Sequence, residues 1–485
     1  MMSESPTASS SARGLPLAVD LDGTLLKTDL LFESLVLLLK ENPLLAFFLP
    51  IWLLKGGKAN LKYQIAERVE LDAKLIPLRN DLLEYIAEQR RSGRTIILAT
   101  ATQEKLAKCM ADHLGVFDAV IASDPETNLK GQAKRQALLS LFGERGFDYA
   151  GNDHSDLEIW KHANGAILVG VSRRILDQVK RSRIPVLAVF TKQELSLRTC
   201  ARALRIHQWT KNLLIFVPII AAHQLADLAL LLKNFLAFAA FSLCASSVYL
   251  LNDMFDLAAD RQHPSKKKRP FACGEIGLDT GAVAVTILLA LAFSVAVQVG
   301  PEFLLLLLGY FILTVLYTFK LKKVVLVDVM LLASLYTMRV LGGGVATGIQ
   351  PSFWLLSFSM FLFLSLAMMK RCAELMKMCQ IGDGSPAGRG YISSDLATLS
   401  SLGIASGYLS VLVLALYLHS EHALSSYSHP RVLWLVLPFY LYWISRMWMA
   451  AARGKMHDDP LVYALTERVN QWIWLLAVLL LILGF

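Results

Sequence analysis

The sequence has only six cysteines, and their arrangement indicates neither a disulfide framework nor a metal site. No two of them form a CxxC motif, and their spacing matches no metal-ligand pattern. They are expected to be free thiols in a reducing compartment or in lipid. The first residues, MMSESPTASSSAR, also lack the apolar segment of a signal peptide. Residues 1–13 are therefore predicted to form a disordered tail, and the domain that follows stays in the compartment where it is made.

A basic stripe with interleaved aromatic side chains is missing as well, although the net charge is +9. The Lys and Arg residues lie between long apolar segments, and this distribution excludes a nucleic-acid partner. With 55% hydrophobic residues the chain is too apolar for an ordinary soluble fold, and 485 residues are too many for one domain. The composition predicts a membrane protein of more than one domain.

Residues 252–270, NDMFDLAADRQHPSKKKRP, place an acidic group next to a basic one. Three carboxylates and an amide recur at helical spacings of three and four: Asn252, Asp253, Asp256 and Asp260. Five basic side chains follow: His263, Lys266, Lys267, Lys268 and Arg269. Clustered carboxylates repel one another unless cations neutralise them, and Mg²⁺ shared with phosphate oxygens is the natural choice. We expect a diphosphate–Mg²⁺ site here; the alternative is a solvated loop with scattered charges.

The N-terminal part has the pattern of a soluble α/β domain. Short apolar runs at 15–19, 95–99, 120–122 and 147–150 are predicted strands, and each leads toward polar residues. Polar groups placed repeatedly after strands are typical of the ligand crevice of a parallel, doubly wound sheet. The sequence therefore predicts a Rossmann-like α/β fold for this part.

The motif DLDGT at 20–24, followed by Thr100, Lys130 and the acidic loop GNDHSD at 151–156, resembles the haloacid dehalogenase superfamily of phosphatases. The resemblance covers a domain at 14–185, with a helical cap at about 31–79. It implies that Asp20 is the nucleophile and Asp22 the general acid/base. It also implies that Thr100 and Lys130 hold the transferring phosphoryl group.

The same resemblance implies Mg²⁺ bound by Asp20, Asp22 and Asp156. The last motif departs from the superfamily pattern, because Asn152 stands where an aspartate is usual and Asp153 comes one residue late. A degenerate, purely structural domain is therefore the alternative to an active phosphatase.

Two segments of this part allow different interpretations. Residues 44–54, LLAFFLPIWLL, are very apolar but too short to span a membrane, and prolines bracket most of them. They are predicted to pack in the core of the cap, with a position on the membrane surface as the alternative. Residues 186–204 are predicted to be a basic linker that rests on anionic headgroups.

The rest of the chain predicts an all-α membrane bundle of about nine helices. The apolar spans lie near 211–224, 233–251, 279–298, 302–318, 325–346, 352–369, 398–418, 432–449 and 470–485. Lys and Arg gather in the loops after the even-numbered spans, whereas the opposite loops carry Lys233 and Arg431. This bias predicts a multi-pass protein of the inner membrane whose N-terminal domain and acidic cluster face the cytoplasm.

Charged side chains within and beside these spans are candidate functional residues. Asp328 and Arg339 are eleven residues apart, so the fifth span presents both on one face. A structural role for Arg339, as the partner of a buried acid, is the alternative. The other candidates lie near span ends: Lys211, Tyr317, Lys320, Lys370 and Arg371. The four residues of another polar stretch are expected to form no more than a turn: His457, Asp458, Asp459 and Pro460.

The motif NDxxDxxxD at a membrane helix end resembles the UbiA superfamily of intramembrane prenyltransferases, and residues 205–485 form the corresponding predicted domain. RIHQWTKNLLIF at 205–216, the 252–270 stretch, the segment at 317–343 and KRCAEL from Lys370 resemble its decaprenyl-phosphate phosphoribosyltransferase branch more closely. That branch transfers phosphoribose from phosphoribosyl diphosphate to a polyprenyl phosphate.

Mapped by motif, the resemblance implies that Asp253, Asp256 and Asp260 hold Mg²⁺ and diphosphate together with Asn252. It implies phosphate contacts from Lys211, Lys266 and Arg269, and a second wall with Asp328 and Arg339. The expected partners are thus phosphoribosyl diphosphate, a polyprenyl phosphate and membrane lipids, and a homo-oligomer remains open.

The predicted product carries a phosphate on its sugar, and the fused phosphatase-like domain would remove it. One alternative is an aromatic prenyltransferase that uses a polyprenyl diphosphate. Against it, Leu332 stands four residues after Asp328, where prenyl transferases usually carry a second acid. The other alternative is a lipid-phosphate binder or transporter without catalysis, which would need charged sites near the membrane midplane.

Overall fold

A computed structural model describes residues 14–191, 195–381, 390–420, 429–456 and 459–484. The predicted tail at 1–13 lies outside the described residues, as do His457 and Asp458 of the predicted turn. The chain forms two compact units. The first unit comprises Met1–Leu204 with Tyr249–Val285, and the second comprises Arg205–Val248 with Thr286–Phe485.

The first unit contains a six-stranded parallel sheet, which confirms the predicted α/β fold. Its strands are β1 (Leu17–Val19), β2 (Ile96–Gln103), β3 (Ala119–Ser123), β4 (Asp148–Gly151), β5 (Gly165–Val169) and β6 (Val186–Phe190), in the spatial order β3-β2-β1-β4-β5-β6. Leu17 of β1 is in register with Ile96 of β2 on one side and with Asp148 of β4 on the other. The strand order reverses at β1, and the carboxyl ends of β1 and β4 therefore border the crevice where such sheets bind ligands.

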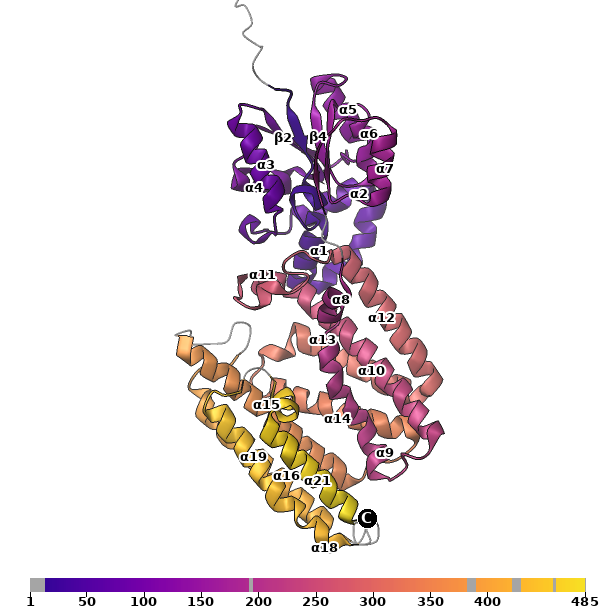
Figure 1. Ribbon diagram of the computed structural model, residues 1–485, viewed down its shortest axis with the longest axis vertical. Helices are drawn as coiled ribbons and strands as arrows, with labels where there is room; N and C mark the ends of the chain where they lie inside the picture. Colours follow the sequence, from indigo (N-terminus) through magenta and orange to yellow (C-terminus); the bar gives the residue numbers. More distant parts are fainter. Residues whose placement is uncertain (1–13, 192–194, 382–389, 421–428, 457–458, 485) are drawn as a thin grey trace, which may run out of the picture. The chain divides into compact units, whose positions relative to one another are not determined.

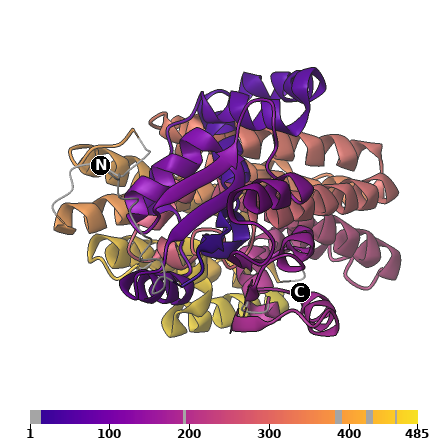
Figure 2. The same cartoon turned by 90° about the horizontal axis from the view of Figure 1, so that it is seen from above.

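The two faces of the sheet are covered by different helices, because successive strand residues point to opposite sides. Leu17 and Val19 belong to a core with α3 (Asn80–Arg91) and α4 (Glu104–Leu114). Ala18 belongs to a second core with α5 (Gln132–Phe142), α6 (Leu157–Trp160) and α7 (Arg173–Arg181). Figures 1 and 2 show the strands between these two helix layers.

The predicted cap consists of α1 (Leu30–Glu41), the 3-10 helix η2 (Pro43–Phe48) and α2 (Leu49–Ala66). Its inner side chains, among them Trp52, form a small core. The outer apolar side chains are exposed, Phe47 to 76% and Leu54 to 87%. The prediction that 44–54 packs in the core of the cap is therefore wrong for these outer side chains. By length and composition, the longer segment Pro43–Ala66, which contains 44–54, counts as a candidate membrane span.

The predicted boundaries of the first domain need two corrections. Strand β6 pairs in parallel with β5, so the sheet continues to Phe190 and the start of the predicted linker 186–204 belongs to it. The linker also contains a short helix, α8 (Leu197–Ala203). In addition, Tyr249–Val285, which was assigned to the membrane domain, forms part of the first unit.

Two ion pairs and one close packing contact attach this segment to the α/β domain. Arg261 makes a two-pronged, buried ion pair with Glu33 of α1, at 2.6 and 3.1 Å. Arg202 lies 2.6 Å from Glu275. A Cβ atom at Gly274 would lie 2.7 Å from the Cβ of Lys27, so only glycine allows this close approach.

The remaining helices confirm a multi-pass helical region. They are α10 (Leu228–Phe255), α11 (Leu257–Gln262), α12 (Leu278–Val299), α13 (Pro301–Phe319), α14 (Val327–Thr347), α15 (Phe353–Ile381), α16 (Asp395–Leu418), α18 (Pro430–Leu433), α19 (Val436–Ala452), α20 (Pro460–Thr466) and α21 (Arg468–Gly484). Within the described ranges, seven helices are long and apolar enough to cross a membrane, and six of these lie between Leu228 and Leu418.

The prediction of nine spans is not confirmed in full. The first predicted span, 211–224, is the 3-10 helix η5 (Ile206–Phe216) followed by the short helix α9 (Val217–Ala221). The eighth predicted span overlaps α19, which has 17 residues, and the ninth overlaps the shorter apolar helix Arg468–Leu480.

Candidate functional site

The DLDGT motif turns sharply at the carboxyl end of β1. Asp20 donates its backbone N–H to Ala150 O at 2.9 Å, and this bond joins it to the end of β4. Gly23 has a φ of 70°, a left-handed conformation that glycine adopts without strain. A Cβ atom there would lie 2.3 Å from Nδ2 of Asn152. The motif thus needs glycine both for its turn and for the approach of the 151–156 loop.

The lysine that contacts Asp20 is Lys134, in the first turn of α5. Its Nζ lies 2.7 Å from Asp20 Oδ1 and 3.0 Å from the hydroxyl of Tyr149, and both partners of the ion pair are nearly buried. Burial alone would lower the pKa of Lys134, but Asp20 and Asp156 outweigh it, so the pKa is raised and the lysine stays charged. This site therefore holds a fixed positive charge beside the candidate nucleophile.

The predicted phosphate lysine, Lys130, has a different neighbour. It lines the cavity, but its side chain is largely exposed and lies 3.3 Å from Asp153. The predicted Thr100 is fully buried and accepts the backbone N–H of Thr102 at 3.1 Å. Thr102, by contrast, lines the cavity and donates its hydroxyl to Asp22.

Asp22 is held in an environment that favours its protonated form. Burial and the nearby Asp29 raise the pKa of Asp22 to about 7, against the opposing effect of the Thr102 hydroxyl. Its Oδ1 also accepts the backbone N–H of Leu30 at 2.9 Å. A carboxyl group that can both donate and accept a proton near neutral pH is suited to general acid/base work.

Asp156 has a structural task in addition to its predicted role as a metal ligand. Its Oδ2 accepts the backbone N–H groups of Asn152 and Asp153, each at 2.9 Å, and its Oδ1 accepts the Tyr149 hydroxyl at 2.9 Å. Asn152 is the acceptor for the hydroxyl of Thr24 at 3.1 Å. The departure in the last motif thus places an amide, in place of a carboxylate, beside the DLDGT turn.

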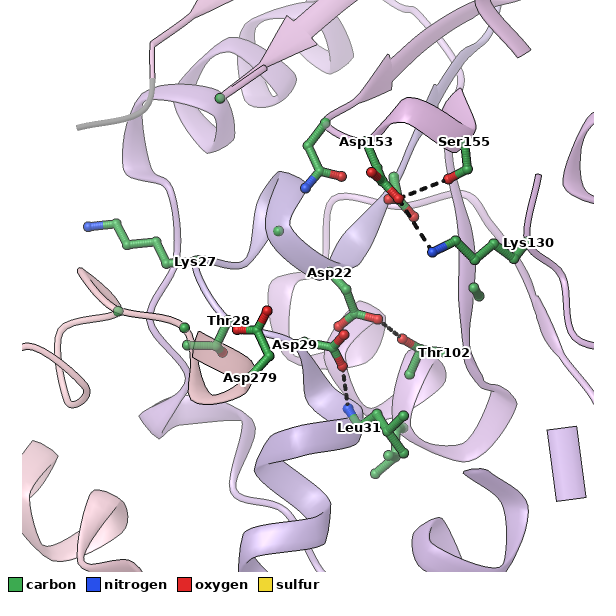
Figure 3. A pocket seen from close by; sticks show the side chains of 18 of the residues that line it. Asp22, Lys27, Thr28, Asp29, Leu31, Thr102, Lys130, Asp153, Ser155 and Asp279 are labelled. Carbon is green, nitrogen blue, oxygen red and sulfur yellow. Dashed lines mark hydrogen bonds and ion pairs between the residues drawn. The ribbon is translucent and has the colours of Figure 1, made fainter. Parts of the chain in front are cut away.

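These side chains line a cavity of about 450 Å³. Figure 3 shows Asp22 with Thr102 and Lys130 with Asp153 on one side, and Thr28 on the other. Residues from the segment that follows α11 also line it: Gly274, Glu275, Gly277, Asp279 and Thr280. The volume is typical of a site for a small organic ligand.

The carboxylates of this cavity fit Mg²⁺ in their chemistry. Burial and the charge of Asp20 raise the pKa of Asp156, and Asp20 adds to the raised pKa of Asp22. A divalent cation would relieve this repulsion, and carboxylate oxygens are the ligands that Mg²⁺ prefers. Throughout the described part of the chain, no three acidic, His or Cys side chains form a ready-made metal cluster.

The acidic cluster at 252–270 is organised around Arg269. The Nη1 atom of Arg269 lies 3.0 Å from Asp253 Oδ1 and 2.6 Å from Asp260 Oδ2, and both carboxylates are buried. The helical face is interrupted at Asp256, which follows the last residue of α10 and occupies the N-cap position of α11. Asn252 and Asp256 are partly buried beside it. The guanidinium of Arg269 thus lies between two carboxylates, in a position where another cation could bind in its place.

The three lysines before Arg269 form the 3-10 helix η6 (Lys266–Lys268), and all three are exposed. Their side chains are accessible to anionic ligands or headgroups in the solvent. Lys266 therefore meets the condition of accessibility for its predicted phosphate contact, whereas Arg269 is already paired with two acids.

In the second unit, two predicted residues form a buried ion pair. Arg371 Nε lies 2.5 Å from Asp328 Oδ2, and Arg371 Nη2 donates to the hydroxyl of Tyr317 at 2.9 Å. Glu374 also contacts Arg371, at 2.6 Å, and Tyr391 donates its hydroxyl to Asp328. The structure thus brings Asp328, Tyr317 and Arg371 together.

Arg339 contacts other elements, Asn212 on η5 and Tyr310 on α13. It donates to Asn212 Oδ1 at 2.7 Å and to the Tyr310 hydroxyl at 2.9 Å, and its guanidinium lies over the rings of Tyr310 and Tyr336. These partners are neutral, so the alternative of a structural partner for an acid is wrong in that detail.

Lys211 and Lys370 meet at Asp459, a residue that no sequence pattern had marked as more than part of a turn. Lys211 forms an ion pair with Asp459, and Lys370 lies 3.5 Å from the same carboxylate oxygen. Burial opposes the charge of Asp459, but the two lysines outweigh it and lower the pKa of Asp459 to about 2. Lys320 is exposed at the end of α13.

The residues that sequence reasoning missed are those whose role depends on distant partners: Lys134, Thr102, Tyr149, Tyr391 and Asp459. A signal existed for Thr102, because alternate residues of a strand point to the same side and Thr102 lies two positions after Thr100. For Asp459 no local signal existed.

Together, the helices and these buried acid–base pairs define a multi-pass membrane protein with an α/β unit at its N-terminus. A model of the UbiA prenyltransferase family matches residues 213–464. The chain belongs to the UbiA prenyltransferase family.

Several known proteins are similar to this chain. An uncharacterised protein of Sinorhizobium fredii, y4nM, is 36% identical over 463 residues, which cover 95% of this chain and 89% of that protein. The nodulation protein NoeC of Azorhizobium caulinodans is 36% identical over 56% of this chain and 87% of its own length. The decaprenyl-phosphate phosphoribosyltransferase of Mycobacterium tuberculosis is 35% identical over 178 residues, which are 36% of this chain and 59% of that enzyme.

Among solved structures, a UbiA homolog from Archaeoglobus fulgidus bound to GPP and Mg²⁺ covers 59% of this chain and 98% of its own. Its TM-score is 0.44 and its sequence identity 16%.

Proposed function

We propose that this protein transfers phosphoribose from phosphoribosyl diphosphate to a polyprenyl phosphate and then removes the remaining phosphate from the sugar. The observation that carries the first step is the 35% identity to an enzyme named decaprenyl-phosphate phosphoribosyltransferase. The second step is supported by the cavity in which Asp20 contacts Lys134.

In the transfer step, the acids and bases of 252–270 bind the diphosphate group. Asp253, Asp256 and Asp260 would hold Mg²⁺, which when bound neutralises the charge that builds on the leaving diphosphate. Arg269 moves from its acids toward a phosphate oxygen, assisted by Lys266. The bond between the sugar carbon and the diphosphate oxygen breaks with its electron pair on the diphosphate. An oxygen of the polyprenyl phosphate forms the new bond to that carbon.

The acceptor phosphate needs no general base, because it is already ionised at neutral pH. It needs positive side chains that hold it, and in the second unit Lys211 and Lys370 are suited to this. In the structure both lysines contact the carboxylate of Asp459. The remaining candidates for substrate contacts are Asn252, Tyr317, Lys320, Asp328, Arg339 and Arg371.

In the dephosphorylation step, a carboxylate oxygen of Asp20 attacks phosphorus, and the bond from phosphorus to the sugar oxygen breaks. Asp22 donates its proton to that oxygen and later takes one from the water that releases phosphate. Lys134 offsets the negative charge between nucleophile and phosphate. Bound Mg²⁺, held by Asp20 and Asp22 with Asp156 nearby, would supply further charge neutralisation.

Both steps would take place at the cytoplasmic face of the inner membrane, as the Lys and Arg distribution favours. The exposed apolar side chains of 44–54 are suited to rest in the interfacial layer of the bilayer. Such a contact would bring the first unit to a substrate that cannot leave the membrane.

The experiment supplies membranes that contain the protein with polyprenyl phosphate and phosphoribosyl diphosphate labelled in its ribose. The proposal expects label in the lipid extract and expects release of inorganic phosphate in a second, later phase. An Asp20→Asn variant should still label the lipid but should leave its sugar phosphate in place. An aromatic prenyltransferase, the second candidate favoured by the family name, would give no labelled lipid in this assay.

A further inference from the structure

The cavity of the first unit is larger than its phosphoryl end. Asp20, Asp22 and Lys134 account for the end near β1 and β4. Thr28, Ser34 and Arg79 line another part, and Figure 3 shows Thr28 well separated from Thr102 and Lys130 across the cavity. Attack on phosphorus does not require these three polar side chains, so their presence in the cavity needs another explanation.

Three polar atoms in this second part are buried without a hydrogen-bond partner among the described residues: Thr28 Oγ1, Ser34 Oγ and Arg79 Nε. The side chain of Thr28 is 3% exposed and that of Ser34 is 0% exposed. Buried polar groups in folded proteins nearly always have partners, so three neighbours of one cavity that lack them indicate a ligand or ordered water. All three can donate a hydrogen bond, and the two hydroxyls can also accept one.

A carboxylate from the other part of the chain adds an acceptor. Asp279, in the first turn of α12, lines the same cavity, and its Oδ1 accepts from the hydroxyl of Thr280 at 3.4 Å. Its charge contributes to the raised pKa of Asp29, whose largest cause is burial, so the two carboxylates are near each other. Figure 3 shows both with Thr28.

The segment that carries Asp279 is fixed to the α/β domain. The Arg261–Glu33 ion pair holds one end of it, and the close approach of Gly274 to Lys27 and Pro77 holds its middle. Asp279 is therefore presented to the cavity by a segment that packs against the domain.

We propose that Thr28, Ser34, Arg79 and Asp279 form a subsite for the hydroxyl groups of a phosphorylated sugar, next to the phosphoryl site of Asp20. Vicinal hydroxyls donate to a carboxylate and exchange hydrogen bonds with buried hydroxyls, and acidic side chains bind ribose hydroxyls in this manner in nucleotide sites. An alkyl phosphate would leave the buried groups without partners, which is how such sites discriminate strongly against substrates that lack a hydroxyl.

The inference rests on the proposed phosphatase function and adds the residues that recognise the sugar of its substrate. It also means that the 249–285 segment, part of the region related to UbiA proteins, supplies a specificity residue to the phosphatase cavity. The two proposed activities would then depend on a common segment of the chain, 249–285.

The test uses the full-length protein in detergent and compares ribose 5-phosphate with pentyl phosphate by release of inorganic phosphate. The wild type should have a kcat/KM for ribose 5-phosphate that is at least about a hundredfold higher. Thr28→Val, Ser34→Ala and Asp279→Asn should each lower this ratio about tenfold or more, and Thr28→Ser should retain it because the hydroxyl remains. Ser140→Ala, an exposed serine of α5 outside the cavity, is the matched control.

Asp279 is exposed, so its substitution serves where a buried variant fails to fold. If the wild type hydrolyses both substrates equally, or if the variants keep the ratio, the subsite is overturned while the phosphatase remains. If neither substrate is hydrolysed by the wild type, as with Asp20→Asn, the proposed phosphatase and this inference both fail.

Discussion

Lys134 Nζ lies 2.7 Å from Asp20 Oδ1, in an ion pair that is almost closed to solvent. We predict that Lys134→Met lowers phosphate release from ribose 5-phosphate at least about a hundredfold, because the charge that offsets the attacked phosphate is lost. The uncompensated Asp20 should also reduce the stability of the fold by about 3–5 kcal/mol.

The matched control for this prediction is Lys130→Met. Its lysine is largely exposed and pairs with Asp153, an interaction worth about 0–1 kcal/mol. Phosphate release should stay within a few-fold of the wild type. Equal losses in the two variants would contradict the assignment of Lys134.

Arg269 bridges Asp253 and Asp260. We predict that its replacement weakens the binding of diphosphate. In Arg269→Gln, KM for phosphoribosyl diphosphate should rise about tenfold to a hundredfold, because a charge-assisted contact to phosphate is removed. Lys267→Gln changes an exposed lysine of the same loop and should have little effect. The measurement is the initial rate of lipid labelling; similar KM values for both variants would argue against a phosphate contact of Arg269.

Removal of divalent metal should stop the transfer step. With excess EDTA the rate of lipid labelling should fall at least about a hundredfold, because the leaving diphosphate loses its neutralising charge. Added Mg²⁺ should restore the rate. Undiminished labelling in EDTA would mean that Asp253, Asp256 and Asp260 act without a metal.

The buried Asp328–Arg371 ion pair predicts that loss of Arg371 destabilises the protein more than loss of Arg446, another arginine of the second unit. Arg371→Met removes the cation beside the fully buried carboxylate of Asp328 and should lower the free energy of unfolding by about 3–5 kcal/mol. Arg446→Met breaks a pair with Glu467 that is partly exposed, and should cost about 1 kcal/mol or less. Thermal unfolding in detergent measures both, and a smaller loss for Arg371→Met would show that its pair contributes little.

The exposed apolar surface of the cap predicts a membrane contact. Leu54→Asp should lower dephosphorylation of the lipid product, relative to that of soluble ribose 5-phosphate, because a charge at the membrane surface opposes insertion of this side chain. Leu141→Asp places the same charge at another exposed leucine, on α5, and should leave the ratio unchanged. An unchanged ratio in Leu54→Asp would contradict the contact.

Much of the fold could be predicted from the sequence, because strand runs and polar strand ends are local patterns. The position of Asp20 at the end of β1 follows from such a pattern. The choice between Lys130 and Lys134 does not, since it depends on where α5 begins. Gly131, with a φ of 59°, precedes the helix, so Lys130 lies outside it and Lys134 turns inward.

Other features depend on contacts that are distant in the sequence. Lys211 and Asp459 meet across 248 positions, and no local signal relates them. The exposure of Leu54 could not be read from its apolar neighbours, because the same run fits a protein core and a membrane surface equally well. The attachment of Arg261 to Glu33 likewise required the folded structure.

The most direct measurement is the mass of the lipid formed from polyprenyl phosphate and phosphoribosyl diphosphate by the wild type and by Asp20→Asn. We predict a polyprenyl-phosphoryl ribose in the wild type and the same lipid carrying one additional phosphate in the variant. A wild type that leaves the polyprenyl phosphate unmodified, in the presence of Mg²⁺, would contradict the account.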